Sequence, residues 1–174
     1  MHSEKSELSL PENVRQQSKL IQRENGFTFR DLNKNGRLDI YEDPRQPTAA
    51  RVEDLLSQMT LAEKAGMLFI DGVRVNPDGS IEEKAGEQAF TGFGSSVKDK
   101  VTDLQMNHFN IWQIPGAQPL AIWYNNVQQL AEQTRLGIPV TLASDPRHHL
   151  GKNVVSMAVE DFSQWCETTG FGAL

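Results

Sequence analysis

Oxygen-bearing side chains recur at alternate positions in the stretch "DLNKNGRLDIYE", which runs from residue 31 to residue 42. A hard cation such as calcium takes about six to eight oxygen ligands, and alternate side chains of a tight loop can converge on one point. Glycine at the sixth place permits the sharp turn, and the spacing as a whole matches the calcium loop of an EF-hand. The predicted ligands are the side chains of Asp31, Asn33, Asn35, Asp39 and Glu42 and the backbone carbonyl of Arg37.

The same loop has a second interpretation, a turn rich in Asn and Gly whose polar side chains bond to its own backbone. We favour calcium, because so many fixed positions rarely match by accident. A loop with only a few carboxylates predicts modest affinity. A structural role is expected rather than a sensor role, since the sequence has no second loop to form a pair. Pro44 and Pro47 would also interrupt any helix that leaves Glu42.

A second candidate group lies where a predicted strand ends. In "PLAIWYNNVQQLAEQTRLGIPVTLASDPRHH", a helical stripe is followed by Gly137, which we expect to end the helix, and by the uncharged β-run "IPVTLAS". Parallel α/β proteins bind ligands at the C-terminal ends of their strands, which is where Asp145 falls. The alternative is that Asp145, which precedes Pro146, only caps a turn. The stripe consists of Leu120, Trp123, Val127 and Leu130.

Two amphipathic segments follow the calcium-type loop. "TAARVEDLLSQM" predicts a helix over 48–59 with Thr48 as its N-cap. Thr60 and Glu63 have the spacing of a capping box, which predicts a second short helix. The apolar run 67–70 then predicts a buried strand. The stripe of the first helix consists of Val52, Leu55, Leu56 and Met59.

The remaining segments carry weaker signals. Residues 1–26 predict a polar arm with a short helical tendency before Gly26. The pair Asp78 and Gly79 predicts a tight turn between short strands. "SVKDKVTDLQMNHF" predicts a helix over 96–109, with one side formed by Val97, Val101, Leu104 and His108.

Composition bounds the functional class. A net charge of -6 and a pI near 5.2 argue against nucleic acid as a partner, since nucleic-acid binding requires a basic face. No apolar run is long enough to span a membrane. The N-terminal residues lack the apolar core of a signal peptide. A single cysteine, Cys166, excludes an internal disulfide. A weak calcium site favours a periplasmic or secreted location, and a cytoplasmic one stays open.

Four pieces of the chain, in family order, resemble the N-terminal part of glycoside hydrolase family 3, the β-glucosidase and exo-β-glucanase family. They are "DLNKNGRLDIYEDPRQP", "RVEDLLSQMTLAEKAGML", "NNVQQLAEQTRLGIPVTLASDPRH" and "FSQW". The resemblance implies an α/β fold, the N-terminal half of a (β/α)8 TIM-like barrel, because a full barrel takes about 250 residues. It implies a polar arm over 1–26, a calcium-type loop segment over 27–47 and a partial barrel over 48–174.

The resemblance also implies an activity. Family members are retaining enzymes with an aspartate nucleophile and a carboxylic acid/base, and they hydrolyse terminal β-D-glucosyl residues of oligosaccharides or glucans. Asp145 matches the family aspartate that bonds hydroxyls of the terminal sugar, whereas Arg147 either pairs with a carboxylate or contacts substrate. The family's nucleophile and acid/base come later in the chain than residue 174. We therefore expect this chain to be inactive alone and to need a complementing C-terminal fragment. The alternative is a non-catalytic, calcium-stabilised module that binds carbohydrate or protein.

Histidines and tryptophans have competing interpretations. His108, His148 and His149 suggest zinc, but they lack zinc-site spacing, so we favour histidines near a binding cleft. Trp123 is expected in the core rather than against a sugar, because it belongs to the helical stripe.

Overall fold

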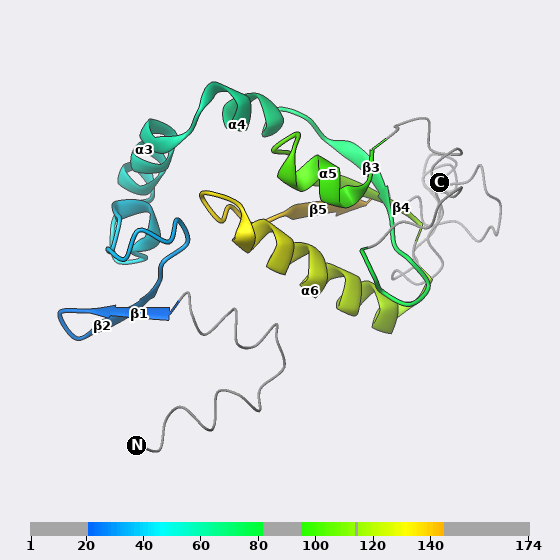
Figure 1. The fold of residues 1–174 in the computed structure, drawn as a ribbon, viewed down its shortest axis with the longest axis horizontal. Helices are drawn as coiled ribbons and strands as arrows, with labels where there is room; N and C mark the ends of the chain where they lie inside the picture. The colour runs from blue at the N-terminus through cyan, green and yellow to red at the C-terminus, as the bar shows by residue number, and fades with distance from the viewer. Residues whose placement is uncertain (1–20, 82–94, 114, 145–174) are drawn as a thin grey trace, which may run out of the picture.

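The computed structural model describes residues 21–81, 95–113 and 115–144, which form a mixed α/β arrangement (Figure 1). Among these residues no helix is both long and apolar enough to cross a bilayer. The elements are β1 (Ile21–Glu24), β2 (Phe27–Arg30), the 3-10 helix η1 (Ile40–Glu42), α3 (Thr48–Gln58), α4 (Leu61–Gly66), β3 (Asp71–Arg74), α5 (Val97–Thr102), β4 (His108–Gln113), α6 (Ala117–Gln133) and β5 (Thr141–Ser144).

The strands β1 and β2 form an antiparallel hairpin that precedes the calcium-type loop. Glu24 pairs with Phe27, which leaves a two-residue turn at Asn25 and Gly26. Both turn residues have positive φ angles, 49° and 82°, as a type I′ turn requires. The helical tendency expected before Gly26 is therefore wrong for residues 21–24, and the rest of the predicted arm lies outside the described residues.

The strands β3, β4 and β5 form a parallel sheet in which each strand lies beside its predecessor in sequence. The helix α5 connects β3 to β4, and α6 connects β4 to β5. The two helices pack against each other and lie alongside one face of the sheet (Figure 1). Parallel strands joined by helices are the repeating unit of α/β folds.

The core lies between α6 and this sheet. Phe109 from β4 and Trp123 and Val127 from α6 are almost completely buried, at 0%, 1% and 0% exposure. Leu130 is also buried and Leu120 is partly buried against the same cluster. The predicted stripe of α6 and the core position of Trp123 are therefore confirmed.

The two helices after the loop form where the sequence predicts them. The capping box of α4 is present, because the Thr60 hydroxyl accepts from Glu63 N at 3.2 Å and the Glu63 carboxylate accepts from Thr60 N at 2.8 Å. In α3, however, the N-cap is Pro47 and Thr48 is the first helical residue. Its stripe is only partly covered: Met59 is buried and Leu55 half-buried, whereas Val52 and Leu56 are exposed.

The predicted buried strand over 67–70 is wrong. Leu68, Phe69 and Ile70 are exposed at 85%, 63% and 68%, and β3 begins only at Asp71. Pairing with β4 decides this boundary, since the first aligned residues are Asp71 and Phe109. The turn predicted at residues 78–79 is confirmed by a bond from Gly79 N to Asn76 O at 2.9 Å, although no strand follows it in residues 80–81.

The helix predicted over 96–109 is too long. α5 ends at Thr102, Gln105 has a φ of 56°, and His108 already lies in β4. Val97 and Val101 are buried as expected, whereas Leu104 is exposed. The strand replaces the helix because residues 109–111 pair with β3 on one side and with β5 on the other. Such tertiary pairing overrides local helix propensity.

Candidate functional site

The loop from residue 31 to residue 42 closes on itself through its first side chain. Asp31 is buried, and its two carboxylate oxygens accept from Asn35 N at 3.1 Å and from Gly36 N at 2.9 Å. Gly36 has a φ of 76°, a left-handed conformation that glycine adopts without strain. The first and sixth positions of the predicted motif are thus joined directly.

The last side chain of the loop reaches back to its start. One Glu42 oxygen accepts from Leu32 N at 2.6 Å and from Asn33 N at 3.3 Å, and the other accepts from Asp39 N at 3.2 Å. Burial raises the pKa of Glu42, and these backbone donors offset only part of that effect. The carboxylate therefore lies in an environment that an additional positive charge would stabilise.

Three of the predicted ligands meet at a single carboxylate oxygen. Asp39 Oδ2 accepts from Asn33 Nδ2 at 2.5 Å and from Asn35 Nδ2 at 2.6 Å. The amide oxygens of the two asparagines accept from backbone N–H groups, those of Asn35 and Arg37 respectively. The alternative interpretation, a turn that bonds to its own backbone, thus describes the two backbone contacts, whereas the bonds to Asp39 join side chains.

The donor set nevertheless fits a hard cation. Rotation of each asparagine amide would exchange its nitrogen for its oxygen at the point where Asn33, Asn35 and Asp39 meet. Within the described part of the chain, there is no group of three or more His, Cys, Asp or Glu side chains that could hold a metal ion. A cation here would thus depend on amide and carbonyl oxygens as well as on carboxylates, which is typical of calcium rather than of zinc.

The segment after the loop is fixed to the hairpin. Arg45 pairs with Asp43, with 2.7 Å between Nε and Oδ1, and its guanidinium lies 3.8 Å from the centre of the Phe27 ring. The side-chain bonds from Arg45 hold the pKa of Asp43 well below its ordinary range. A planar guanidinium suits both contacts, since it can bond a carboxylate and stack on an aromatic face.

The loop and the hairpin are also fixed to α6 and to the segment that follows it. Tyr41 Oη donates to Leu136 O at 3.2 Å, and Arg30 pairs with Glu132 at 2.5 Å. Gly137, expected to end the helix, lies beyond the helix end at Gln133 and has a φ of 58°. A Cβ at Gly137 would lie 2.9 Å from Leu32 O. Glycine is therefore required there both by conformation and by the close approach of the loop.

The predicted sugar-site residues Asp145 and Arg147 lie outside the described residues, as do His148 and His149. The last described residue is Ser144, the end of β5, which is aligned with Ile111 of β4. Because β3, β4 and β5 are parallel, their C-terminal ends share one edge of the sheet. Asp145 directly follows that edge in the sequence.

Two ion pairs that sequence reasoning missed lie near the start of the parallel sheet, away from the edge where its strands end. Lys100, which is buried, pairs with Asp71 at 3.0 Å and donates to Gly72 O at 3.0 Å. Arg135 pairs with Glu63 at 2.5 Å and links α4 to the end of α6. Burial alone would raise the pKa of Glu63, but the bonds from Arg135 and Thr60 lower it overall. The spacing of Thr60 and Glu63 indicates the capping box. No neighbouring residue indicates that Glu63 also pairs with Arg135, or that Asp71 pairs with Lys100.

Together these features define the class of the chain: an α/β protein with a sequentially ordered parallel sheet preceded by a β-hairpin and a loop that its own polar side chains close. No protein-family model matches the chain. It is 43% identical over 153 residues, 86% of its length, to a periplasmic beta-glucosidase/beta-xylosidase of Dickeya chrysanthemi. It is 39% identical over 144 residues, 81% of its length, to a probable beta-glucosidase C of Aspergillus oryzae. Beta-glucosidase C of Emericella nidulans is 37% identical over 146 residues, 83% of this chain.

The chain is thus a homologue of β-glucosidases, consistent with glycoside hydrolase family 3, and corresponds to their N-terminal part. It spans about 22% of the length of each of these curated relatives.

Proposed function

We propose that this chain supplies the first strands and helices of the catalytic barrel of a retaining β-glycosidase. The observation that carries the proposal is the sequential order of β3, β4 and β5 with a helix before each new strand. A (β/α)8 barrel adds all its strands in this order, whereas a doubly wound fold keeps the order only within each half of its sheet. The β-glucosidase relatives support the same function.

The proposed substrate is a terminal β-D-glucosyl residue of an oligosaccharide or glucan. Asp145 would accept hydrogen bonds from its hydroxyls, because a carboxylate at the end of β5 makes strong, charge-assisted bonds. Arg147 would either orient Asp145 or contact the sugar. The 174 residues contain no "SDW"-type nucleophile motif, so hydrolysis through a glycosyl-enzyme intermediate would require a complementing C-terminal segment.

A reconstitution experiment tests this function. The chain is mixed or fused with the remaining part of the Dickeya chrysanthemi relative, and release of glucose from an aryl β-glucoside is measured. We expect no turnover by either part alone and turnover by the pair, with Asp145→Asn lowering kcat/KM at least about 100-fold. A folded pair that hydrolyses no β-glucoside would contradict the proposal. In this test Asn125→Ala serves as a matched control, because Asn125 is exposed on α6.

The loop at residues 31–42 is proposed to bind calcium as a structural ion. The convergence of Asn33, Asn35 and Asp39 and the buried carboxylate of Glu42 support this role. A periplasmic or secreted location is proposed with it, since the Dickeya relative is named as periplasmic and a weak site needs abundant calcium. The second candidate function, a non-catalytic calcium-stabilised binding module, is favoured by the same loop. It predicts carbohydrate or protein binding by the chain alone.

A further inference from the structure

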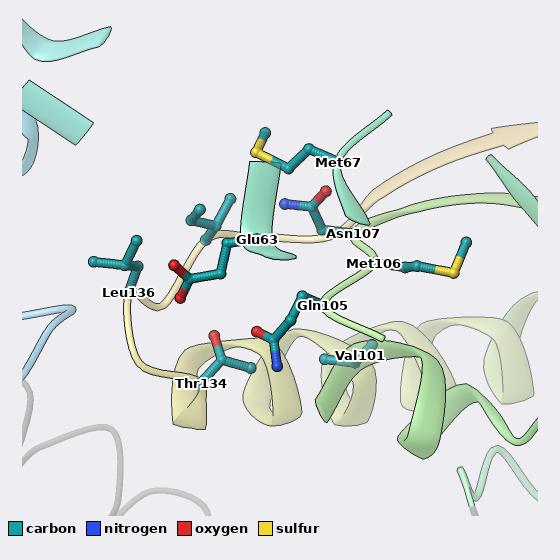
Figure 2. A pocket seen from close by; sticks show the side chains of 9 residues that line it. Glu63, Met67, Val101, Gln105, Met106, Asn107, Thr134 and Leu136 are labelled. Atoms are coloured by element: carbon teal, nitrogen blue, oxygen red, sulfur yellow. The ribbon is translucent and has the colours of Figure 1, made fainter. Parts of the chain in front are cut away.

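A small cavity lies where three segments meet before the strands β4 and β5. Its volume is about 20 Å³. It is bounded by α4, by the segment between α5 and β4, and by the segment between α6 and β5. Figure 2 shows Glu63, Gln105 and Asn107 among the side chains that line it, each pointing in a different direction. The remaining lining residues are Met67, Val101, Met106, Thr134, Leu136 and Ile138.

One polar atom of this lining has no partner. Asn107 is 6% exposed, and its side-chain oxygen Oδ1 is fully buried without a hydrogen-bond partner in the described part of the chain. The backbone carbonyl of the same residue is used, because Asn107 O accepts from Thr141 N at 2.8 Å and so aligns the start of β5. Buried acceptors in folded proteins are nearly always bonded, to the protein or to ordered water.

We propose that this cavity holds one ordered water molecule that donates a hydrogen bond to Asn107 Oδ1. A cavity needs about 10–15 Å³ to hold a water, so the available volume fits a single one and excludes larger ligands. A buried water typically makes about three hydrogen bonds. The Glu63 side chain also lines the cavity, and its Oε1 accepts from Arg135 Nε at 3.0 Å.

The water would hold the side chain of Asn107, the residue that precedes β4, and the backbone of Asn107 in turn fixes Thr141 of β5. The position of β5 sets where its last residue, Ser144, lies at the edge of the sheet. The water is therefore a positioning element for the strand end rather than a reactant.

The experiment is a crystal structure of the wild-type chain at a resolution that shows ordered water, with water-to-amide cross-relaxation in solution as a second measurement. We expect one water about 2.7–3.0 Å from Asn107 Oδ1. In solution we expect cross-relaxation between the amide of Asn107 and a water that exchanges slowly with the solvent. In Asn107→Leu the water should be absent, and in Ile138→Val, which keeps the acceptor, it should remain.

Two results would overturn the proposal. One is an empty cavity in the wild-type crystal with no water cross-relaxation. The other is an Asn107 side chain that turns and bonds a protein group. Melting temperatures separate the cases, because removing a truly unpaired acceptor by Asn107→Leu would raise the Tm, whereas removing a water-bridged one would lower it. If Asn107→Leu does not fold, the two wild-type measurements alone decide.

Discussion

At the scale of single residues, Glu42 is the group on which the proposed calcium loop depends most. It is buried and binds the backbone at both ends of the loop. We predict that calcium raises the Tm of the wild type and that Glu42→Ala abolishes this rise. The change is measured by thermal denaturation with calcium and after chelation. Glu53→Ala is the control, since Glu53 is exposed on α3. A calcium-induced shift that is unchanged in Glu42→Ala would contradict the proposal.

Glu63 gives the fold a dependence on pH. Its pKa is lower in the folded chain than in the unfolded one, so its contribution is complete above the unfolded pKa, about 4.3, and disappears as the pH falls through the folded pKa. We predict that Glu63→Gln loses about 1 kcal/mol of unfolding free energy at pH 7. The difference from wild type should shrink as the pH falls below the unfolded pKa, as measured by urea denaturation. A difference that is constant from pH 7 to pH 3 would show that ionisation plays no part.

Gly137 is the position where conformation and space both exclude a side chain. Gly137→Ala is predicted to cost about 2 kcal/mol or more, because it adds a left-handed alanine and a contact with Leu32 O. Gly26→Ala separates the two causes, since Gly26 also has a positive φ but has no neighbouring atom within 4 Å of the place that a Cβ would take. Equal losses of unfolding free energy in the two variants would mean that the contact with the loop costs nothing.

At the scale of elements, the caps of α3 and α4 differ in a way that can be measured. Thr60 accepts a bond from Glu63 N, whereas Thr48 is the first residue of α3 and no side-chain cap bond is made there. We predict that Thr60→Ala lowers the unfolding free energy by about 1 kcal/mol and that Thr48→Ala leaves it nearly unchanged. Guanidinium denaturation of both variants checks this. A larger loss of unfolding free energy in Thr48→Ala than in Thr60→Ala would indicate that Thr48 caps α3.

Elements whose signals are local were predictable from the sequence. The capping box at Thr60 and the stripe of α6 depend on residues within a few helical turns, so their pattern survives in any context. The hairpin also had a local signal, the pair Asn25 and Gly26, which indicates a type I′ turn.

Elements that depend on distant partners were not predictable in the same way. β4 forms because β3 and β5 flank it, and the start of β3 is set by its alignment with Phe109. The spacing of the loop predicts that its polar side chains converge, but it could not predict the approach of Leu32 to Gly137. Nor could the pairing of Glu63 with Arg135 be predicted, because the partners are 72 residues apart.

At the scale of the whole molecule, exposed apolar side chains accompany uncovered sheet edges. Leu68, Phe69 and Ile70 form an apolar run before β3, and within the described residues β3 and β5 each have only one neighbouring strand. Such edges and patches favour association. We predict that the chain alone self-associates as its concentration rises, and that Phe69→Ser reduces this without lowering the Tm. Light scattering after gel filtration measures the association, and a monomeric, cooperative melt above about 60 °C would contradict it.

The sequential order of the parallel sheet also has a consequence for how the chain folds. Each strand pairs with the strand that precedes it in the sequence, so each contact forms between segments that leave the ribosome one after the other. Asp71 aligns with Phe109 and His108 with Thr141, and the entropy of closing such loops grows only slowly with their length. The sheet can therefore grow during synthesis, with β3 as the template for β4 and β4 as the template for β5. In this process β5 is the growing edge, and the next segment to be made is the one that begins with Asp145.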